Sequence, residues 1–341
     1  MTDKIRAVMV GCGEISKVWL QPSVGMENLE IVGLVDLRAE AARTRAAEFG
    51  LTNALCETDL AQVLDRTRPD VVFNATIPEA HLDVTLKAFK RGCHVLGEKP
   101  MADSMDNARR MIQAARDAGK ILAIIQNRRY LAGVRRMKRF LDSGALGAVS
   151  TVDCDFYLAF HPGGYREQIR HVLLLDMAIH TFDVARYLMG ADVRAVYCHE
   201  WNPRGSWYAH GASAACIFEM SNGAVFNYRG SWCANGLATP WNSEWRFVGE
   251  KGTAKWTKDE EYAAREVIDA KSTQFRSLEV APFDLTDRIG EHGGVIREFL
   301  DCMTRGGTPE TVCTDNIKSL AMVFAAIESA ETGQRVEVAS S

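Results

Sequence analysis

The first 125 residues alternate short apolar runs with longer amphipathic stretches, and no other feature of the sequence restricts the fold as strongly. Runs typical of β-strands occupy residues 5–10, 30–35, 70–75, 93–97 and 121–126, and stretches with helical periodicity occupy residues 39–49, 79–91 and 103–118. Strands joined by crossover helices form a parallel sheet with helices on both faces. We therefore predict an α/β fold whose N-terminal part is a doubly wound parallel sheet.

From Asn127 onward the pattern becomes richer in strands. Helices are expected at about residues 134–143, 172–189, 294–304 and 315–332, and extended segments at residues 149–160, 193–201, 212–220, 224–232, 244–249 and 253–256. Turn-forming residues between the later segments favour antiparallel pairing. We expect a C-terminal α+β domain with an open-faced, mainly antiparallel sheet, and domains at residues 1–126 and 127–341.

Composition argues against several classes of protein. Lys and Arg number 40 against 44 Asp and Glu, and the formal charge of −4 gives no broad basic surface for nucleic acid. No apolar run approaches the ~20 residues of a membrane span, and Met1–Arg6 runs straight into a predicted strand rather than a signal peptide. Nine scattered cysteines without a Cys-x-x-Cys pair indicate neither a disulfide framework nor a zinc site. We expect a cytoplasmic protein with a small-molecule partner.

A glycine motif, Gly11-Cys12-Gly13-Glu14-Ile15-Ser16, directly follows the first predicted strand and opens a helix. A dinucleotide fingerprint needs glycines there, because the backbone must turn tightly and approach a pyrophosphate at the helix N-terminus. Asp36 ends the second strand about twenty residues further on, where a carboxylate can bond the ribose hydroxyls and repel a 2'-phosphate. Ser16 replaces the third glycine and is small enough for close packing. These features predict a Rossmann domain that binds NAD.

Arg38, two residues after Asp36, leaves NADP as the alternative cofactor. Its guanidinium could stack on adenine or pair with the 2'-phosphate of NADP. If Arg38 is only a solvated residue at the start of a helix, Asp36 alone sets the preference. We favour NAD.

Polar segments follow three of the predicted strands: Thr76-Ile77-Pro78, Glu98-Lys99-Pro100 and Asn127-Arg128-Arg129-Tyr130. Because ligands bind beyond the carboxyl ends of parallel strands, these segments should open on one crevice. The ammonium of Lys99 could stabilise a developing alkoxide. Glu98 could pair with Lys99 or contact the cofactor amide. We also expect a cis Lys99–Pro100 peptide bond at this sharp turn.

The apolar stretch at residues 172–189 predicts a buried helix with its polar residues on one stripe. Asp176, His180 and Asp183 are spaced i, i+4 and i+7, and burying them is costly unless the stripe faces a polar crevice. His180 is the candidate general base, and Asp176 can orient its ring. A metal is the weaker alternative, because only His171 offers a third ligand and no metal-binding motif is present.

Together these motifs resemble the glucose-fructose oxidoreductase, inositol dehydrogenase and rhizopine catabolism (Gfo/Idh/MocA) family over almost the whole chain. The resemblance rests on the glycine motif and on Glu98-Lys99-Pro100, Arg128-Arg129-Tyr130, Asp176-x-x-x-His180 and Glu328-Ser329-Ala330-x-x-Gly333. It implies NAD(P)-dependent hydride transfer between nicotinamide and a sugar, inositol or related polyol. It also implies an open sheet whose free face often packs against another subunit, and C-terminal helices that return to the first domain.

The resemblance and the strand-end positions together imply roles for individual residues. The catalytic residues would be Lys99, Asp176 and His180. The cofactor-binding residues would be Gly11, Cys12, Gly13, Glu14, Ile15, Asp36, Arg38, Ala75, Thr76, Pro78, His81, Glu98, Lys99, Asn127 and Arg166. The substrate-binding residues would be Lys99, Arg128, Tyr157, His161, Arg170, Asp176 and His180.

One segment departs from the family pattern. Relatives often carry three glycines shortly before the Asp-x-x-x-His helix, where this chain has Arg170-His171-Val172. Bulky side chains there should reshape the pocket. Tyr165-Arg166 resembles an aromatic-Arg pair of the family and is expected to touch nicotinamide or substrate.

We therefore predict an NAD(P)-dependent dehydrogenase that acts on CH–OH groups. The alternatives within the family are a dihydrodiol or biliverdin-type reductase and a redox-assisted glycosidase. The alternative of another class is a non-catalytic NAD-sensing regulatory protein, against which the presence of Lys99 and His180 argues.

The β-rich half also carries six of the seven tryptophans: Trp201, Trp207, Trp232, Trp241, Trp245 and Trp256. We expect an exposed aromatic sheet face that pairs in a homodimer or homotetramer. In the alternative interpretation, some of these indoles line the sugar site.

Overall fold

The computed structural model describes residues 4–258, 261–269, 274–282 and 289–339. By its internal contacts the chain divides into two compact units. The first comprises Met1–Tyr130 and Arg288–Ile317, and the second comprises Leu131–Asp287 and Lys318–Ser341. The predicted domain boundary after residue 126 stays a prediction. No helix in the described ranges is long and apolar enough to cross a membrane.

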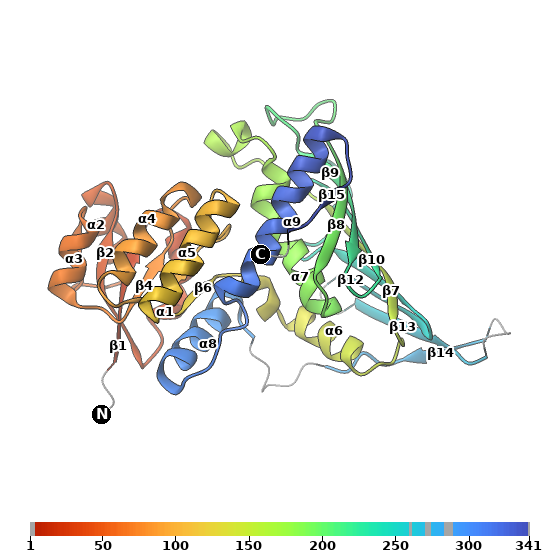
Figure 1. Cartoon of the computed structure of the whole chain (residues 1–341), viewed down its shortest axis with the longest axis horizontal. Helices are drawn as coiled ribbons and strands as arrows, with labels where there is room; N and C mark the ends of the chain where they lie inside the picture. The colour runs from red at the N-terminus through yellow and green to blue at the C-terminus, as the bar shows by residue number, and fades with distance from the viewer. Residues whose placement is uncertain (1–3, 259–260, 270–273, 283–288, 340–341) are drawn as a thin grey trace. The chain divides into compact units, whose positions relative to one another are not determined.

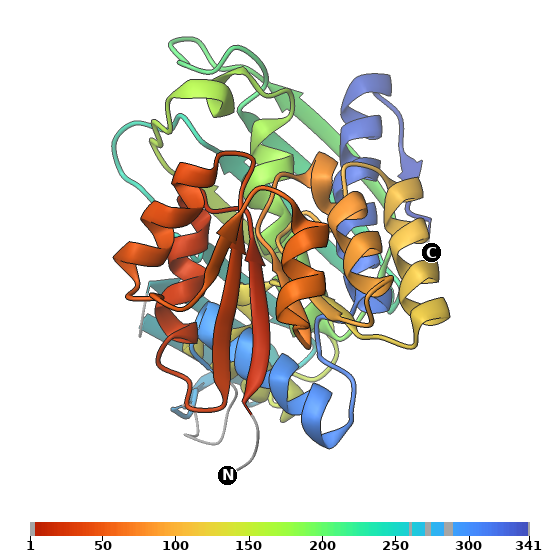
Figure 2. The ribbon, with the colours of Figure 1, turned by 90° about the vertical axis from the view of Figure 1, so that its left-hand side faces the viewer.

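The first unit contains a six-stranded parallel sheet with helices on both faces (Figure 2). In spatial order its strands are β3 (Leu55–Glu57), β2 (Leu29–Val35), β1 (Ile5–Val10), β4 (Val71–Asn74), β5 (His94–Gly97) and β6 (Leu122–Ile124). Its helices are α1 (Ile15–Ser23), α2 (Ala39–Glu48), α3 (Leu60–Thr67), α4 (Pro78–Phe89), α5 (Met105–Ala118) and α8 (Glu291–Arg305), with the short 3-10 helix η1 (Asn127–Tyr130) after β6. The predicted doubly wound sheet is confirmed.

The strand order reverses between β1 and β4, where the chain leaves one half of the sheet and starts the other. In doubly wound sheets ligands bind at such a switch point, outside the carboxyl ends of the strands. The central strands are apolar on both faces and almost fully buried, as a parallel sheet between two helical layers requires. The switch point therefore places the loops after β1 and β4 side by side.

The second unit is built on a nine-stranded sheet in the order β14-β13-β12-β11-β7-β10-β9-β8-β15. All neighbouring strands are antiparallel except β7 and β10, which are parallel. The strands are β7 (Val149–Tyr157), β8 (Val193–Trp201), β9 (Ser213–Met220), β10 (Val225–Ser231), β11 (Glu244–Gly249), β12 (Gly252–Lys258), β13 (Glu261–Val267), β14 (Phe275–Leu278) and β15 (Val336–Glu337). The predicted open, mainly antiparallel sheet is confirmed, although β13 and β14 were not expected.

Helices cover one face of this sheet: α6 (Ala132–Asp142), α7 (Ile179–Met189) and most of α9 (Cys313–Thr332) (Figure 1). Phe182 on α7 fixes the contact, because its ring lies 4.7 Å from Phe218 and 5.2 Å from Tyr228, measured between centroids. Along β7, buried Val152, Cys154 and Phe156 alternate with less buried residues, the period of a sheet packed on one face only. In the described residues no helix covers the opposite face.

The predicted helix at residues 172–189 forms as two pieces. A π-helical turn, η3 (Leu173–Ala178), carries Asp176, and α7 begins at Ile179. The prediction that three polar residues share one stripe facing a polar crevice is wrong for Asp183. Asp183 is 1% exposed and accepts a hydrogen bond of 2.7 Å from the hydroxyl of Ser319, so it belongs to the core rather than to a polar crevice.

Candidate functional site

The two glycines of the loop after β1 differ in their surroundings. Gly11 has φ of +90°, and a β-carbon there would lie 2.4 Å from the carbonyl oxygen of Ala75 in the loop after β4. Gly13 faces open space, with nothing within 4 Å of the position of its missing β-carbon. The backbone at Gly13 can therefore be approached closely from outside, as a pyrophosphate requires.

Asp36 lies beside this loop at the end of β2. Its two carboxylate oxygens accept backbone N–H groups, one from Cys12 and one from Arg38, both at 2.9 Å. Each carboxylate oxygen can accept more than one hydrogen bond, and the side chain remains 16% exposed. The carboxylate thus fits the predicted contact with ribose hydroxyls. The side chain of Arg38 is 81% exposed, with its Nε 4.0 Å from Asp36.

Arg45 on α2 supports the same loop, and the sequence interpretation missed it. Its guanidinium donates to the carbonyl oxygens of Cys12 and Gly13 at 3.3 and 3.1 Å, while its side chain is only 7% exposed. These bonds fix the two loop carbonyl groups on the side of the loop that faces α2. An arginine on the buried Ala42–Ala46 face of a helix was the available signal.

Other loop residues predicted to bind cofactor are placed as follows. Glu14 is exposed and forms ion pairs with Lys17 at 3.2 Å and Arg45 at 3.6 Å, while Ile15 begins α1. Burial, and then the charge of Asp36, raises the pKa of the Cys12 thiol to about 12, so this cysteine stays a neutral side chain below the loop. The side chains of Cys12 and Glu14 are therefore engaged within the protein, whereas the backbone at Gly13 remains open.

His81 joins the loops after β4 and β5. Its side chain is buried, with 1% of the residue exposed. Its Nδ1 lies 3.0 Å from the carbonyl oxygen of Pro100, and its Nε2 lies 3.1 Å from that of Thr76. The predicted cofactor contact of His81 is not supported, because both ring nitrogens already face loop carbonyls. Burial lowers the pKa of His81, which favours the neutral ring. Pro78 begins α4 within the same loop.

Glu98 is a buried anion, 5% exposed, held by groups from three segments. Its Oε1 accepts a 3.0 Å bond from the indole of Trp19 and lies 3.8 Å from Nε2 of His292, and its Oε2 accepts the N–H of Lys99 at 2.9 Å. Burial acts to raise the pKa of Glu98, but His292 and the charge of Lys99 outweigh it and hold that pKa below its usual range. We infer that Glu98 anchors the loop of Lys99 instead of reaching for the cofactor amide.

Lys99 itself is half-buried, and its peptide bond to Pro100 is cis, as predicted. After β6, the amide of Asn127 donates to Glu291 at 3.5 Å. Burial lowers the pKa of the Arg128 guanidinium to about 10, against the opposing charge of Glu291. The first unit thus gathers Gly11, Asp36, Thr76, Lys99 and Asn127 at the carboxyl edge of one sheet.

In the second unit the polar residues gather around η3. The guanidinium of Arg166 lies 4.0 Å from the carboxylate of Asp176. His180 follows one turn later at the start of α7, with its Nδ1 buried. Burial, together with the charges of Asp176 and Glu167, raises the pKa of Tyr208, which the sequence did not single out, to about 12.

Three predicted substrate contacts are placed differently. Tyr157 lies on the sheet face opposite to α7, because strand alternation puts it with Asp155 rather than with buried Phe156. His161 is exposed and stacks on Trp207 with ring centroids 3.6 Å apart. Arg170 is exposed and lies 3.4 Å from Glu331. The structure therefore brings neither Tyr157 nor Arg170 to Asp176.

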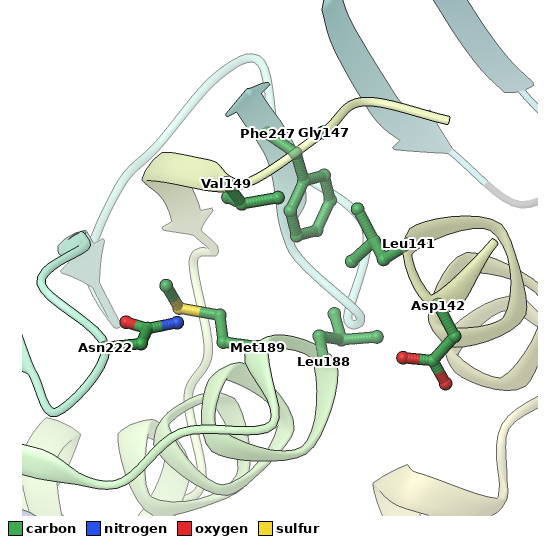
Figure 3. A pocket seen from close by; sticks show the side chains of 8 residues that line it. All are labelled: Leu141, Asp142, Gly147, Val149, Leu188, Met189, Asn222 and Phe247. Atoms are coloured by element: carbon green, nitrogen blue, oxygen red, sulfur yellow. The ribbon is translucent and has the colours of Figure 1, made fainter. Parts of the chain in front are cut away.

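A pocket of about 180 Å³ in the second unit lies away from these residues (Figure 3). Leu188 and Met189 at the end of α7 contribute to it, together with Leu141 and Phe247. With a rise of about 1.5 Å per residue, Leu188 is about 12 Å along the helix axis from His180. The pocket is thus separate from the polar cluster at η3.

In the described ranges, no three His, Cys, Asp or Glu side chains are grouped so that they could hold a metal ion. The weaker metal alternative involved His171 as a third ligand. The ring of His171 instead lies 2.6 Å from a carboxylate oxygen of Glu200.

Two sequence families match most of the chain. Residues 5–126 match the family described as "Oxidoreductase family, NAD-binding Rossmann fold". Residues 134–255 match the family described as "GFO/IDH/MocA C-terminal domain". The first match covers the parallel sheet with the glycine loop, and the second covers much of the open sheet.

Individual proteins are similar over nearly their full length. An uncharacterized protein of Sinorhizobium fredii, y4oX, is 30% identical over 99% of this chain and 96% of its own. The D-apiose dehydrogenase of Paraburkholderia graminis is 26% identical over 99% of this chain and 90% of its own. An oxidoreductase from Agrobacterium radiobacter, crystallised with NAD+, L-tartaric acid and magnesium, superposes with a TM-score of 0.87 at 20% identity over 98% of both chains, and so shares the fold.

Proposed function

This chain belongs to the GFO/IDH/MocA family of oxidoreductases, and from that premise we propose that it is an NAD-dependent dehydrogenase of sugars or related polyols. The reaction moves a hydride between the nicotinamide ring and a carbon that bears a hydroxyl group. In the reverse direction it reduces a ketone or lactone.

The glycine loop is the observation that carries the proposal. The β4 loop excludes any side chain at Gly11, whereas the space above Gly13 is open. Asp36 lies beside the loop, and its partly exposed carboxylate suits ribose hydroxyls and disfavours a 2'-phosphate. The guanidinium of Arg45 donates hydrogen bonds to the carbonyl oxygens of Cys12 and Gly13 and so stabilises the loop. These residues fit a dinucleotide, and the chemistry that NAD supplies when bound is acceptance or return of the hydride.

The proton is handled by the chain's own side chains. Lys99 stabilises the negative charge that develops on the substrate oxygen as its proton leaves. His180 takes that proton, and Asp176 orients the imidazole and favours its protonated form. The guanidinium of Arg166 lies 4.0 Å from the carboxylate of Asp176 and forms an ion pair with it.

The substrate class is proposed from chemistry and from the relatives. One similar protein is named D-apiose dehydrogenase, after a sugar. The similar Agrobacterium structure was crystallised with L-tartaric acid, which also carries neighbouring hydroxyl groups. Cationic and hydrogen-bonding groups such as Lys99 and His180 suit the recognition of a polyhydroxylated molecule.

A spectrophotometric screen of sugars, inositols and sugar acids with NAD and with NADP tests the function. We expect absorbance at the nicotinamide band to change with at least one polyhydroxylated compound, and to change more with NAD. A protein that binds NAD in a calorimeter but turns over no compound would favour the non-catalytic sensor instead.

We also propose that the open sheet face mediates a homodimer or homotetramer. Tyr197 and Ile217, which are cross-strand partners on β8 and β9, are 46% and 51% exposed, and nearby Trp201 is 41% exposed. The prediction that the tryptophans form the exposed face is wrong for Trp232, Trp245 and Trp256, which are only 2–3% exposed and belong to the core. The apolar patch on β8 and β9 supports the pairing instead.

A cytoplasmic location remains part of the proposal. All nine cysteines lie within the described ranges, and none forms a disulfide there. Even Cys198 and Cys216, with sulfur atoms 3.4 Å apart on neighbouring strands, are unbridged. This arrangement suits a reducing compartment.

A further inference from the structure

His171 has a backbone conformation that residues with a β-carbon rarely adopt. Its φ is +56°, in the left-handed region, and it stands two residues before the π-helical turn that carries Asp176. An L-residue in this region is destabilised relative to glycine, so contacts of its side chain must compensate. His171 is also where the chain turns into the helical segment that continues to His180.

The imidazole of His171 is fixed between two carboxylates from distant segments. Its Nδ1 lies 2.6 Å from Glu200 on β8, and its Nε2 lies 3.3 Å from Glu331 on α9. The side chains of His171 and Glu200 are 13% and 9% exposed. A β-carbon on Gly211 would lie 2.6 Å from Glu200, so the loop after β8 leaves space for this carboxylate by having a glycine there. We call His171, Glu200 and Glu331 the histidine clamp.

The charges around the ring favour its protonated form. Glu200 and Glu331 face it from β8 and α9, and on its own segment Arg170 points to Glu331 at 3.4 Å. The hydrogen bond with Glu200 raises the pKa of His171, although burial acts in the opposite direction. A charged imidazole can bond both carboxylates at once, because both ring nitrogens then carry a hydrogen.

We propose that His171 is a positioning residue whose two ion pairs hold the left-handed turn before η3, so that the placement of Asp176 and His180 depends on the charge of His171. For the catalytic roles of Asp176 and His180 this inference rests on the proposed function. The clamp itself does not rest on it, since its contacts lie within the second unit.

The direction of the pH dependence follows from the raised pKa. The clamp is complete below the pKa of the free imidazole, and it is lost as the pH rises through the raised pKa of His171 in the folded protein. The helix start should therefore be well held at acidic and neutral pH and loosened at alkaline pH.

An NMR titration of the imidazole Cε1–H signals, with no substrate present, tests the clamp. We expect His171 to titrate above the range of a free imidazole, and Glu200→Gln to lower its pKa by about one unit. We also expect the His180 signal to show a second inflection at the pH where His171 titrates, and His171→Asn to abolish this inflection. Asparagine tolerates the left-handed backbone but carries no charge.

Steady-state kinetics with a substrate from the screen add the functional readout. Loss of the clamp should lower kcat on the alkaline side with little change in the KM for NAD, and Glu200→Gln should shift that alkaline limb by about one unit toward acid, in parallel with His171. His210→Gln, which removes an exposed histidine of the same unit, serves as the matched control and should leave both titrations unchanged.

Two results would overturn the inference. If Glu200→Gln leaves the titration of His171 unchanged, the clamp does not exist in solution. If His171 titrates as expected but the His180 signal does not respond, the clamp stabilises the fold without positioning the helix. Because both readouts are free of substrate, a chain that turns over no sugar contradicts the proposed function and still tests the clamp.

Discussion

The indole nitrogen of Trp19 donates a 3.0 Å hydrogen bond to the buried carboxylate of Glu98. Trp19 lies on α1, which follows the glycine loop, and Glu98 precedes Lys99. One carboxylate therefore connects the helix behind the cofactor loop to the loop that carries the proposed catalytic lysine.

Replacing Trp19 by Phe should test this connection. The variant retains an aromatic ring but leaves a buried carboxylate oxygen without its indole donor, so we expect the free energy of unfolding to fall by about 1–3 kcal/mol. Urea denaturation measures the change. Unaltered stability would mean that His292 or solvent replaces the indole as the partner of Glu98.

The two glycines of the loop should respond differently to alanine. Gly11→Ala places a β-carbon 2.4 Å from a carbonyl oxygen at φ of +90°, so both stability and NAD binding should be lost. Gly13→Ala meets no protein atom within 4 Å, so it should fold normally and weaken only NAD binding. Thermal melting and calorimetric titration of NAD separate the two effects. A Gly13→Ala variant that binds NAD as tightly as the parent would contradict a close backbone approach there.

Asp36 should set the preference for NAD. We expect Asp36→Ser to narrow or reverse the gap between NAD and NADP, because it removes the negative charge that repels a 2'-phosphate. Titration of both cofactors into parent and variant measures this. Clear preference of the parent for NADP would show that Arg38 outweighs Asp36.

Lys99 and His180 should matter more for the chemical step than for the affinity for NAD, although Lys99 is also predicted to contact the cofactor. Lys99→Met and His180→Gln are each expected to lower kcat by about 10²- to 10⁴-fold. The affinity for NAD should change little, because the glycine loop and Asp36 lie on other segments. Steady-state kinetics measures kcat, and titration with NAD measures the affinity for the cofactor. If a variant retains the full kcat, the replaced residue has no part in the mechanism.

The apolar patch on β8 and β9 should be needed for self-association. Light scattering of the parent at micromolar concentration should report a dimer or tetramer, and Ile217→Asp should shift it toward the monomer by burying a charge in the interface. Glu219→Gln, an exposed change on the same strand, is the control. A parent protein that is monomeric would refute the proposed assembly.

Much of the fold could be predicted because its signals are local. The strand at Ile5–Val10 and those at Val193–Trp201 and Glu244–Gly249 coincide with their expected ranges, since each is an apolar or alternating run between clear turns. By contrast, β13 has the sequence Glu261-Tyr-Ala-Ala-Arg-Glu-Val, whose alanines, glutamates and arginine favour a helix. Pairing with β12 and β14 overrides this preference, and no local pattern reveals such pairing.

The same limit applies to the candidate site. The glycine loop is a short-range pattern and could be recognised in the sequence, and the Asp176–His180 pair, which is also a short-range pattern, stays a prediction. The partners of Glu98 could not be recognised there, because Trp19 and His292 are 79 positions before and nearly 200 positions after it in the chain, and only folding brings them together. Tyr157 was predicted to contact the substrate but lies on the sheet face opposite to α7. One step along a strand reverses the face on which a side chain lies, so a small uncertainty in position changes the prediction.

The π-helical turn Leu173–Ala178 makes the geometry around Asp176 sensitive to the deletion of a single residue. A π turn holds one residue more than an α turn, so removing a single residue within it could restore a regular α-helix. The backbone hydrogen bonds of such an α-helix would have better geometry than those of the π turn. Deletion of Met177 or Ala178 would also bring Asp176 one position closer to His180 in the sequence and so change its direction relative to the imidazole. A shortened chain that proved more stable but inactive would show that the π turn serves the orientation of Asp176 rather than the stability of the fold.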